Sequence, residues 1–124
     1  MTSRTGLLFA LPMAALPCLA EASELMGVWA RGDGKAQVRV DRCGEDLCAT
    51  NIWVKPGTRH ERVGDKLIMD VEPVSQSRYE GKARDVRRGM TYSMEISLEG
   101  AAMRTRGCVL GKLICKSADW TSMN

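Results

Sequence analysis

The sequence predicts an all-β domain, a small antiparallel sandwich or barrel of about eight short strands. Polar and apolar residues alternate with period two in short segments, and glycine-bearing turns separate those segments. The segments recur roughly every ten residues, which is typical of antiparallel sandwiches and barrels. No window after residue 22 has an apolar stripe of helical period and length. We therefore expect one β domain over residues 23–124, with no second domain or internal repeat.

The strands are expected, in chain order, at residues 25–31, 36–42, 48–54, 66–74, 78–84, 90–98, 103–109 and 113–120. Gly32-Asp33-Gly34-Lys35 has the composition of a hairpin turn between the first two. Residues 55–65 are rich in Pro, Gly and charged side chains, as in an exposed connection. Gly89, Gly100 and Gly111 supply the later turns.

The first 22 residues have the three parts of a signal peptide. Arg4 precedes an apolar run at residues 7–20, and small residues surround the expected cleavage site after Ala22. The run is shorter than the roughly 20 residues that a spanning helix needs, and two prolines interrupt it. The sequence therefore predicts export to the periplasm or secretion, with no stable membrane insertion after cleavage.

A lipoprotein signal is an alternative because Cys18 lies in the same segment. In that case the lipidated cysteine would become the first residue of the mature protein. Pro17, directly before it, fits such a signal poorly. Cleavage after Ala22 is preferred, and it removes Cys18 from the mature chain.

The remaining cysteines are Cys43, Cys48, Cys108 and Cys115. An even number in an exported chain favours disulfides over free thiols, and three connectivities are possible. We favour the local pairs Cys43–Cys48 and Cys108–Cys115, because each flanks a short turn-like segment between strands. Loop-closure entropy gives a stabilisation of roughly 2–2.5 kcal/mol for each short loop. A domain of only 102 residues buries little surface, so this contribution is a sizeable share of its stability.

A zinc site formed by these cysteines, or by three of them with His60, is the competing hypothesis. The spacing argues against it, because structural zinc takes thiolates from tight knuckles and residues 109–114 make too long an interval. No Cys-x-x-Cys pair suggests redox activity. We expect no metal and no cofactor.

Alternation also predicts which side chains face the interior. Tyr92, Met94 and Ile96 share one face of a strand, as do Val38 and Val40. Met69, Met94 and Met103 would add flexible thioethers, which adapt to irregular spaces. Such an interior is either an ordinary filled core or the lining of a ligand cavity.

Several motifs resemble an exported bacterial family, domain of unknown function 2147. In order they are Gly27-Val28-Trp29, Val38-Arg39-Val40 leading to Cys43 and Cys48, Trp53, Tyr79-Glu80-Gly81-Lys82, Gly89-Met90-Thr91-Tyr92, and Arg106-Gly107-Cys108-Val109 before Cys115 and Trp120. The resemblance covers residues 25–121. It implies a small lipocalin-like up-and-down barrel and carries no established activity.

The same resemblance implies that Trp29 closes one end of the barrel beneath a basic side chain from a late strand. Arg104, Arg106 and Lys116 are the candidates for this cover, which cation–π attraction would favour. The Trp-x-Arg ending frequent in the family is Trp120-Thr121-Ser122 here. The residues expected to line the interior or a ligand cavity are therefore Trp29, Val38, Val40, Met69, Tyr92, Met94, Ile96 and Met103.

Charge and residue types argue against two classes of function. The net charge is only +3, the longest basic run is Arg87-Arg88, and no aromatic residues interleave with it, so no nucleic-acid partner is expected. His60 with Glu61 lies in an expected loop, and Glu45-Asp46 lies in an expected turn, so neither pair forms a recognisable catalytic arrangement. We do not expect an enzyme.

The preferred function is binding of a small hydrophobic or amphipathic ligand by the barrel. The alternative is a non-enzymatic structural or interaction protein of the cell envelope. It would use loop 55–65 and the basic residues Arg84, Arg87 and Arg88.

Overall fold

The structure is a computed structural model that describes residues 23–124. The expected signal peptide, its cleavage site after Ala22 and the lipoprotein alternative at Cys18 concern residues 1–22, which lie outside the described residues. These expectations stay predictions.

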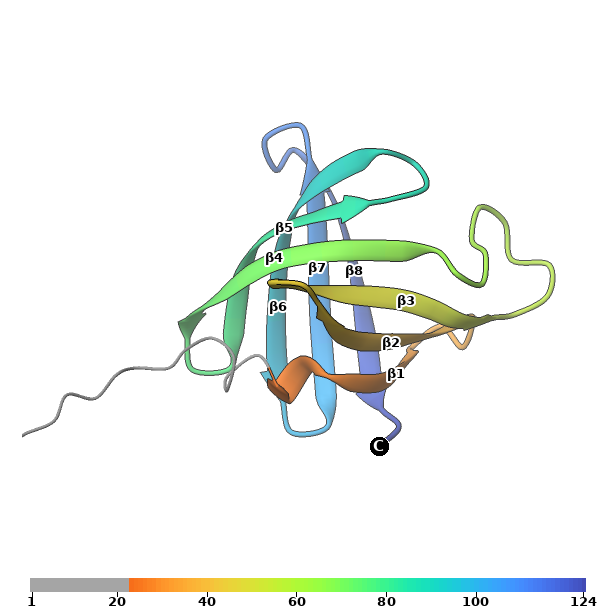
Figure 1. Cartoon of the computed structure of the whole chain (residues 1–124), viewed down its shortest axis with the longest axis horizontal. Helices are drawn as coiled ribbons and strands as arrows, with labels where there is room; N and C mark the ends of the chain where they lie inside the picture. The colour runs from red at the N-terminus through yellow and green to blue at the C-terminus, as the bar shows by residue number, and fades with distance from the viewer. Residues whose placement is uncertain (1–22) are drawn as a thin grey trace, which may run out of the picture.

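The described chain forms a closed barrel of antiparallel strands, each hydrogen-bonded to the next in sequence (Figure 1). The strands are β1 (Gly27–Arg31), β2 (Ala36–Cys43), β3 (Asp46–Val54), β4 (Lys66–Ser75), β5 (Arg78–Asp85), β6 (Met90–Glu99), β7 (Ala102–Val109) and β8 (Ile114–Ser122). β8 returns to pair with β1, so no strand edge is left open. The predicted eight-stranded up-and-down barrel is confirmed, and the sandwich alternative is wrong.

One departure from the predicted strands is at the N-terminal end. Residue 25 was expected to open the first strand, but Leu25 lies in a single 3-10 turn, η1 (Ser23–Leu25). β1 begins only at Gly27, whose φ of 118° is in the region that favours glycine. The chain therefore changes direction at Gly27 before entering the sheet.

The last strand is longer than predicted, and the extra residues close the barrel. β8 continues past Trp120 to Ser122, and Ser122 pairs with Trp29. The chain end lies beside β1 as a result (Figure 1). Closure needs this pairing between residues nearly a whole domain apart, which local alternation does not reveal.

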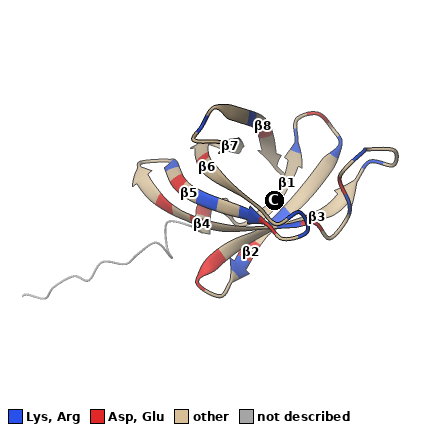
Figure 2. Ribbon diagram, turned by 90° about the horizontal axis from the view of Figure 1, so that it is seen from above, with Lys and Arg blue, Asp and Glu red and all other residues tan. Residues whose placement is uncertain are grey.

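Eleven buried side chains form the hydrophobic core of the barrel. Those that alternation or the family resemblance placed inside are Trp29, Val38, Val40, Met69, Met94, Ile96 and Met103, whereas Tyr92 is only half-buried. The core also contains Leu25, Leu47, Tyr79 and Ala83, which were not among the predicted interior residues. Charged side chains alternate with inward ones along β5, which shows as blue and red bands in Figure 2.

The turn η1 closes one end of the barrel. The Trp29 indole Nε1–H donates to the Leu25 carbonyl oxygen at 2.9 Å, and the Leu25 side chain is only 1% exposed. The Tyr79 hydroxyl, on the other side of the barrel, donates to Glu24 Oε2 at 2.9 Å. These bonds satisfy the polar atoms of two buried aromatic side chains and fix η1 across the barrel end.

The expected basic cover over Trp29 does not form. Arg104 and Arg106 lie on the outward face of β7 and pair with Asp119 and Glu95. Lys116 pairs in register with Gly107, about 20 Å along β8 from the Ser122 that faces Trp29. The partner of the Trp29 indole is instead the preceding backbone turn.

Both predicted local disulfides are confirmed. Cys43–Cys48 fastens the β2–β3 hairpin with a Cα–Cα distance of 5.7 Å, and Cys108–Cys115 fastens the β7–β8 hairpin at 4.0 Å. With both sulfurs of each pair bonded, no thiolate of these four residues is free for zinc. Disulfides of this kind favour an oxidising, extracytoplasmic environment.

Candidate functional site

A cavity of about 1300 Å³, open to solvent, lies at the end of the barrel opposite η1 and reaches down to the side chains of the core. At that end lie the β1–β2 turn, the β3–β4 connection, the β5–β6 turn and the β7–β8 turn, because alternate connections of an up-and-down barrel share one end. The β3–β4 connection, residues 55–65, is called the rim loop below. The barrel is thus closed at one end and open at the other.

The inner part of the cavity is apolar. It is lined by Leu25, Val38, Val40, Ala49, Leu67, Met69, Met94, Ile96, Met103 and the aromatic side chains Tyr92 and Trp120. Every expected interior residue except Trp29 lines this space. Trp29 lies at the closed end, hydrogen-bonded to η1. Three methionines in the lining make its shape adaptable.

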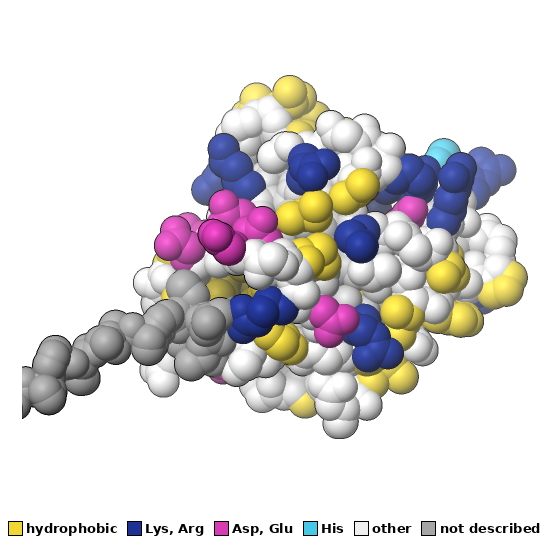
Figure 3. Space-filling model, viewed as in Figure 1, with side chains coloured by type: hydrophobic (Ala, Val, Ile, Leu, Met, Phe, Trp, Pro, Cys, Tyr) yellow, Lys and Arg dark blue, Asp and Glu magenta, His cyan; other side chains and the backbone are white. Residues whose placement is uncertain are grey.

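The outer part of the cavity is strongly charged. Its charged residues are Arg31, Asp33, Lys35, Lys55, Arg59, Glu61, Asp65, Lys66, Asp85, Arg88, Lys116 and Asp119. Figure 3 shows Lys and Arg side chains gathered around the histidine of the rim loop. An apolar interior below a charged rim is the arrangement expected around an amphipathic molecule.

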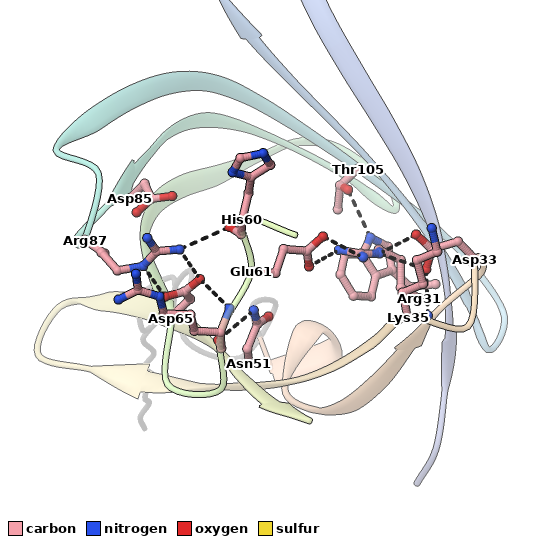
Figure 4. Close-up of polar contacts among 12 residues, drawn as sticks. Arg31, Asp33, Lys35, Asn51, His60, Glu61, Asp65, Asp85, Arg87 and Thr105 are labelled. Carbon is pink, nitrogen blue, oxygen red and sulfur yellow. Dashed lines mark hydrogen bonds and ion pairs between the residues drawn. The ribbon is translucent and has the colours of Figure 1, made fainter. Parts of the chain in front are cut away.

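One side of the rim loop is held by Arg31. The guanidinium donates two hydrogen bonds to the Glu61 carboxylate, Nη1 to Oε1 at 2.8 Å and Nη2 to Oε2 at 2.9 Å (Figure 4). Arg31 Nε also reaches Asp33 at 3.0 Å. The hydrogen bond to Glu61 raises the pKa of Arg31. Two parallel bonds give this pair a defined geometry, which a single contact would not.

The other side of the rim loop is held by the β5–β6 turn. Arg87 donates to both carboxylate oxygens of Asp65, at 2.6 and 2.8 Å, and to the His60 carbonyl at 3.1 Å (Figure 4). The hydrogen bond from Arg87 lowers the pKa of Asp65 to about 2. Arg88 also donates to the His60 carbonyl. The loop is therefore tied to the barrel from two directions.

Asp85 is the one buried charged residue among those that the structure describes. Its carboxylate accepts from Arg88 Nη1 at 2.6 Å and from the Arg88 backbone N–H at 2.9 Å. It lies on the inward face of β5 with Ala83 and Tyr79. A buried carboxylate needs such donors, so Arg88 and Asp85 form a structural unit at the rim.

Arg87 and Arg88 of the predicted basic cluster are thus engaged within the molecule, whereas Arg84 is exposed on β5. The pairing of Arg31 with Glu61 and of Arg87 with Asp65 could not be predicted because the partners lie 30 and 22 positions apart. Asp85 is only three positions from Arg88, but the pair depends on the turn after β5. The charged composition of residues 55–65 indicated only an exposed connection.

No group of three or more His, Cys, Asp or Glu residues in the described chain is arranged to hold a metal ion. His60 contributes its backbone carbonyl to the contacts with Arg87 and Arg88. Within residues 23–124, no helix is long and apolar enough to cross a membrane.

The fold and cavity define a class of protein: a small, disulfide-linked, up-and-down β-barrel with one open end. Residues 27–122 match the model of a family described as "Uncharacterized protein conserved in bacteria (DUF2147)", and the chain belongs to that family. No curated protein and no solved structure matches the chain.

Proposed function

We propose that the domain is a non-catalytic binding protein for a small amphipathic molecule. The apolar part of the ligand would lie among the inner side chains, and its polar part would lie at the rim loop. The observation that carries this proposal is the open cavity of about 1300 Å³ with an apolar lining below a charged rim. This volume is as large as the pockets that usually hold small ligands, roughly 300–1000 Å³.

Two features support a cavity that stays open. Gly107 lines the cavity and contributes no side chain to its wall. Its φ is not positive, so the backbone at this position could carry a larger residue. A Cβ atom at this position would meet Tyr92 Cβ at 3.9 Å, an ordinary contact. The rim loop is also tied to the barrel by Arg31 and Arg87, so it keeps its place above the cavity without a ligand.

The envelope-interaction alternative has less support. It relied on Arg84, Arg87 and Arg88 as a docking surface, and two of these three form ion pairs with Asp65 and Asp85. A partner would have to break those pairs or rely on Arg84 alone. No observation favours it over ligand binding.

The test is a cavity-filling substitution read with an uncharged dye. Nile red should bind the wild-type protein saturably with a rise in fluorescence. Gly107→Leu places a leucine in the cavity and should weaken binding about tenfold or more, equivalent to about 1.4 kcal/mol. The matched control is Thr91→Leu, which adds the same side chain at an exposed position of β6.

Equal binding by Gly107→Leu and Thr91→Leu would contradict the proposal, as would failure of the wild type to bind. The melting temperatures of both variants should stay close to the wild-type value. If Gly107→Leu does not fold, Met94→Trp, which also enlarges a cavity-lining side chain, replaces it and the same comparison applies.

We also propose that the protein functions in the periplasm or is secreted. The two disulfides support an oxidising location, and residues 1–22 have the pattern of a signal peptide. The intact mass of the protein from its own host should correspond to a chain starting at Ser23 and lacking the four hydrogens of two disulfides. A cytosolic, full-length, reduced chain would contradict this proposal.

A further inference from the structure

We propose that the ligand carries an anionic head group and that Lys116 binds it at the open end of the barrel. This inference rests on the proposed binding function and specifies its ligand class, a single-chain amphiphile with a negative head. Three observations lead to it: the charge balance of the cavity, the place of Lys116 on β8, and its neighbours Gly107 and Tyr92.

Each acidic residue that lines the cavity forms an ion pair with an arginine, although Asp33 and Glu61 share Arg31. Asp33 and Glu61 pair with Arg31, Asp65 with Arg87, Asp85 with Arg88, and Asp119 with Arg104. In contrast, the cavity-lining cations without an ion pair within residues 23–124 are Lys35, Lys55, Arg59, Lys66 and Lys116. The uncompensated charge around the cavity is therefore positive.

Lys116 differs from the other unpaired cations because it lies on the inward face of a strand. Register between β7 and β8 is continuous, so Lys116, Ala118 and Trp120 share one face. Trp120 packs on the core, and its Nε1–H donates to Thr105 Oγ1 at 3.0 Å, which fixes that face as the inner one. Lys35, Lys55 and Arg59 lie in connections, and Lys66 alternates with the inward Leu67.

The space beside Lys116 is left open by its register partner, Gly107. Across Gly107, on β6, is Tyr92, whose Cβ is 3.9 Å from the position a Cβ of Gly107 would take. The Tyr92 hydroxyl has only Met90 Sδ as its hydrogen-bond partner within the described chain, at 3.8 Å, and a thioether is a weak acceptor. Lys116, which is exposed, and Tyr92 therefore lie on the strands to either side of Gly107, and both line the cavity.

An anion in the space beside Gly107 would supply a strong acceptor for both groups. Charge-assisted hydrogen bonds from an ammonium to a carboxylate are stronger than neutral ones. The apolar chain of the same molecule would extend toward Met94, Met103 and Ile96, which line the cavity below. A cationic head group would instead meet the excess positive charge and be disfavoured.

The test compares probes that share one chain and differ in head group. Dodecanoate, dodecanol and dodecyltrimethylammonium are titrated below their critical micelle concentrations, and affinities are measured by calorimetry. Dodecanoate should bind the wild type about tenfold or more tightly than dodecanol, with dodecyltrimethylammonium weakest. Lys116→Met should remove most of the preference for dodecanoate and leave dodecanol affinity nearly unchanged.

The matched control is Lys82→Met, which removes the same charge from an exposed, outward position on β5. It should leave the preference intact, and Lys116→Arg should retain most of it. Tyr92→Phe should weaken the binding of dodecanoate by a smaller factor than Lys116→Met does.

Equal affinity of the wild type for dodecanoate and dodecanol would overturn the inference and leave the proposed binding function standing. If Lys82→Met abolished the preference for dodecanoate over dodecanol as fully as Lys116→Met does, the assignment to Lys116 would be overturned. Absence of binding by all three probes and by Nile red would instead overturn the binding function itself.

Discussion

Arg31 and Glu61 join the rim loop to the barrel wall through two parallel hydrogen bonds, although 30 positions separate them in the chain. Their side chains are only 18% and 24% exposed. A partly buried, two-pronged pair of this kind is better ordered than a surface ion pair. It keeps the charged loop above the open end, where it defines the entrance to the apolar cavity.

Removing this pair should free one side of the rim loop without unfolding the barrel. In Glu61→Gln the carboxylate charge is lost, so hydrogen exchange in residues 55–65 should become faster while exchange in the strands stays unchanged. The control is Glu99→Gln. Glu99 is exposed at the end of β6 and forms no ion pair within residues 23–124. Unchanged exchange in the rim loop would show that Arg31 does not hold it.

The second tie of the rim loop should be sensitive to acid. The pKa of Asp65 is lowered to about 2 from its usual 3.8 by the hydrogen bond from Arg87. A lowered pKa in the folded state means that the contact stabilises the fold above pH 3.8 and that this contribution is lost as the pH falls toward 2. Carboxyl-carbon NMR should give a midpoint for Asp65 near 2, and Arg87→Gln should move it back toward 3.8.

The control for the acid prediction is Arg84→Gln, which removes an exposed arginine from the neighbouring strand. It should leave the Asp65 midpoint low. A midpoint near 3.8 in the wild-type protein would contradict the Arg87–Asp65 contact.

Leu25 should contribute strongly to stability even though it precedes the first strand. Its side chain is buried among core residues, and its backbone carbonyl receives the Trp29 indole N–H. Leu25→Ala should lower the free energy of unfolding by about 2–5 kcal/mol, as for other buried leucines. Leu113→Ala, at a position 84% exposed, should change it by less than about 0.5 kcal/mol. Equal effects in urea denaturation would show that η1 does not close the barrel.

The two disulfides should stabilise the barrel by similar amounts. Each closes a short hairpin, and the paired cysteines are 5 and 7 positions apart in the chain, so loop-closure entropy gives roughly 2–2.5 kcal/mol for each. The double variants Cys43→Ser/Cys48→Ser and Cys108→Ser/Cys115→Ser are compared with the wild type by urea denaturation. Stability unchanged by both replacements would contradict a structural role for the bonds.

The strands, their order and most of the interior could be predicted from the sequence, because period-two alternation and turn glycines are local signals. Val38, Val40, Met94 and Ile96 are examples of side chains placed inward by alternation alone. Both cysteine pairs were predictable for the same reason, since each lies across a single hairpin.

What the sequence did not reveal depends on which side chains and backbone groups the fold brings into contact. Leu25 was predicted to begin the first strand, and Glu24 was given no role; their part in closing the barrel end depends on Trp29 and Tyr79. The basic residues Arg87 and Arg88 look like a free charged patch until Asp65 and Asp85 are brought beside them. The unpaired state of Lys116 likewise emerges only when the ion pairs of the acidic residues at the rim are known.

The central claim, that a ligand enters the barrel, is tested most directly by NMR of methyl-labelled methionines during titration with dodecanoate and dodecanol. Met69, Met94 and Met103 are buried and line the cavity, whereas Met123 is 51% exposed at the chain end. We predict saturable shifts of the three cavity methyl groups with little change at Met123. Shifts confined to Met123, or no shifts with either probe, would contradict the claim.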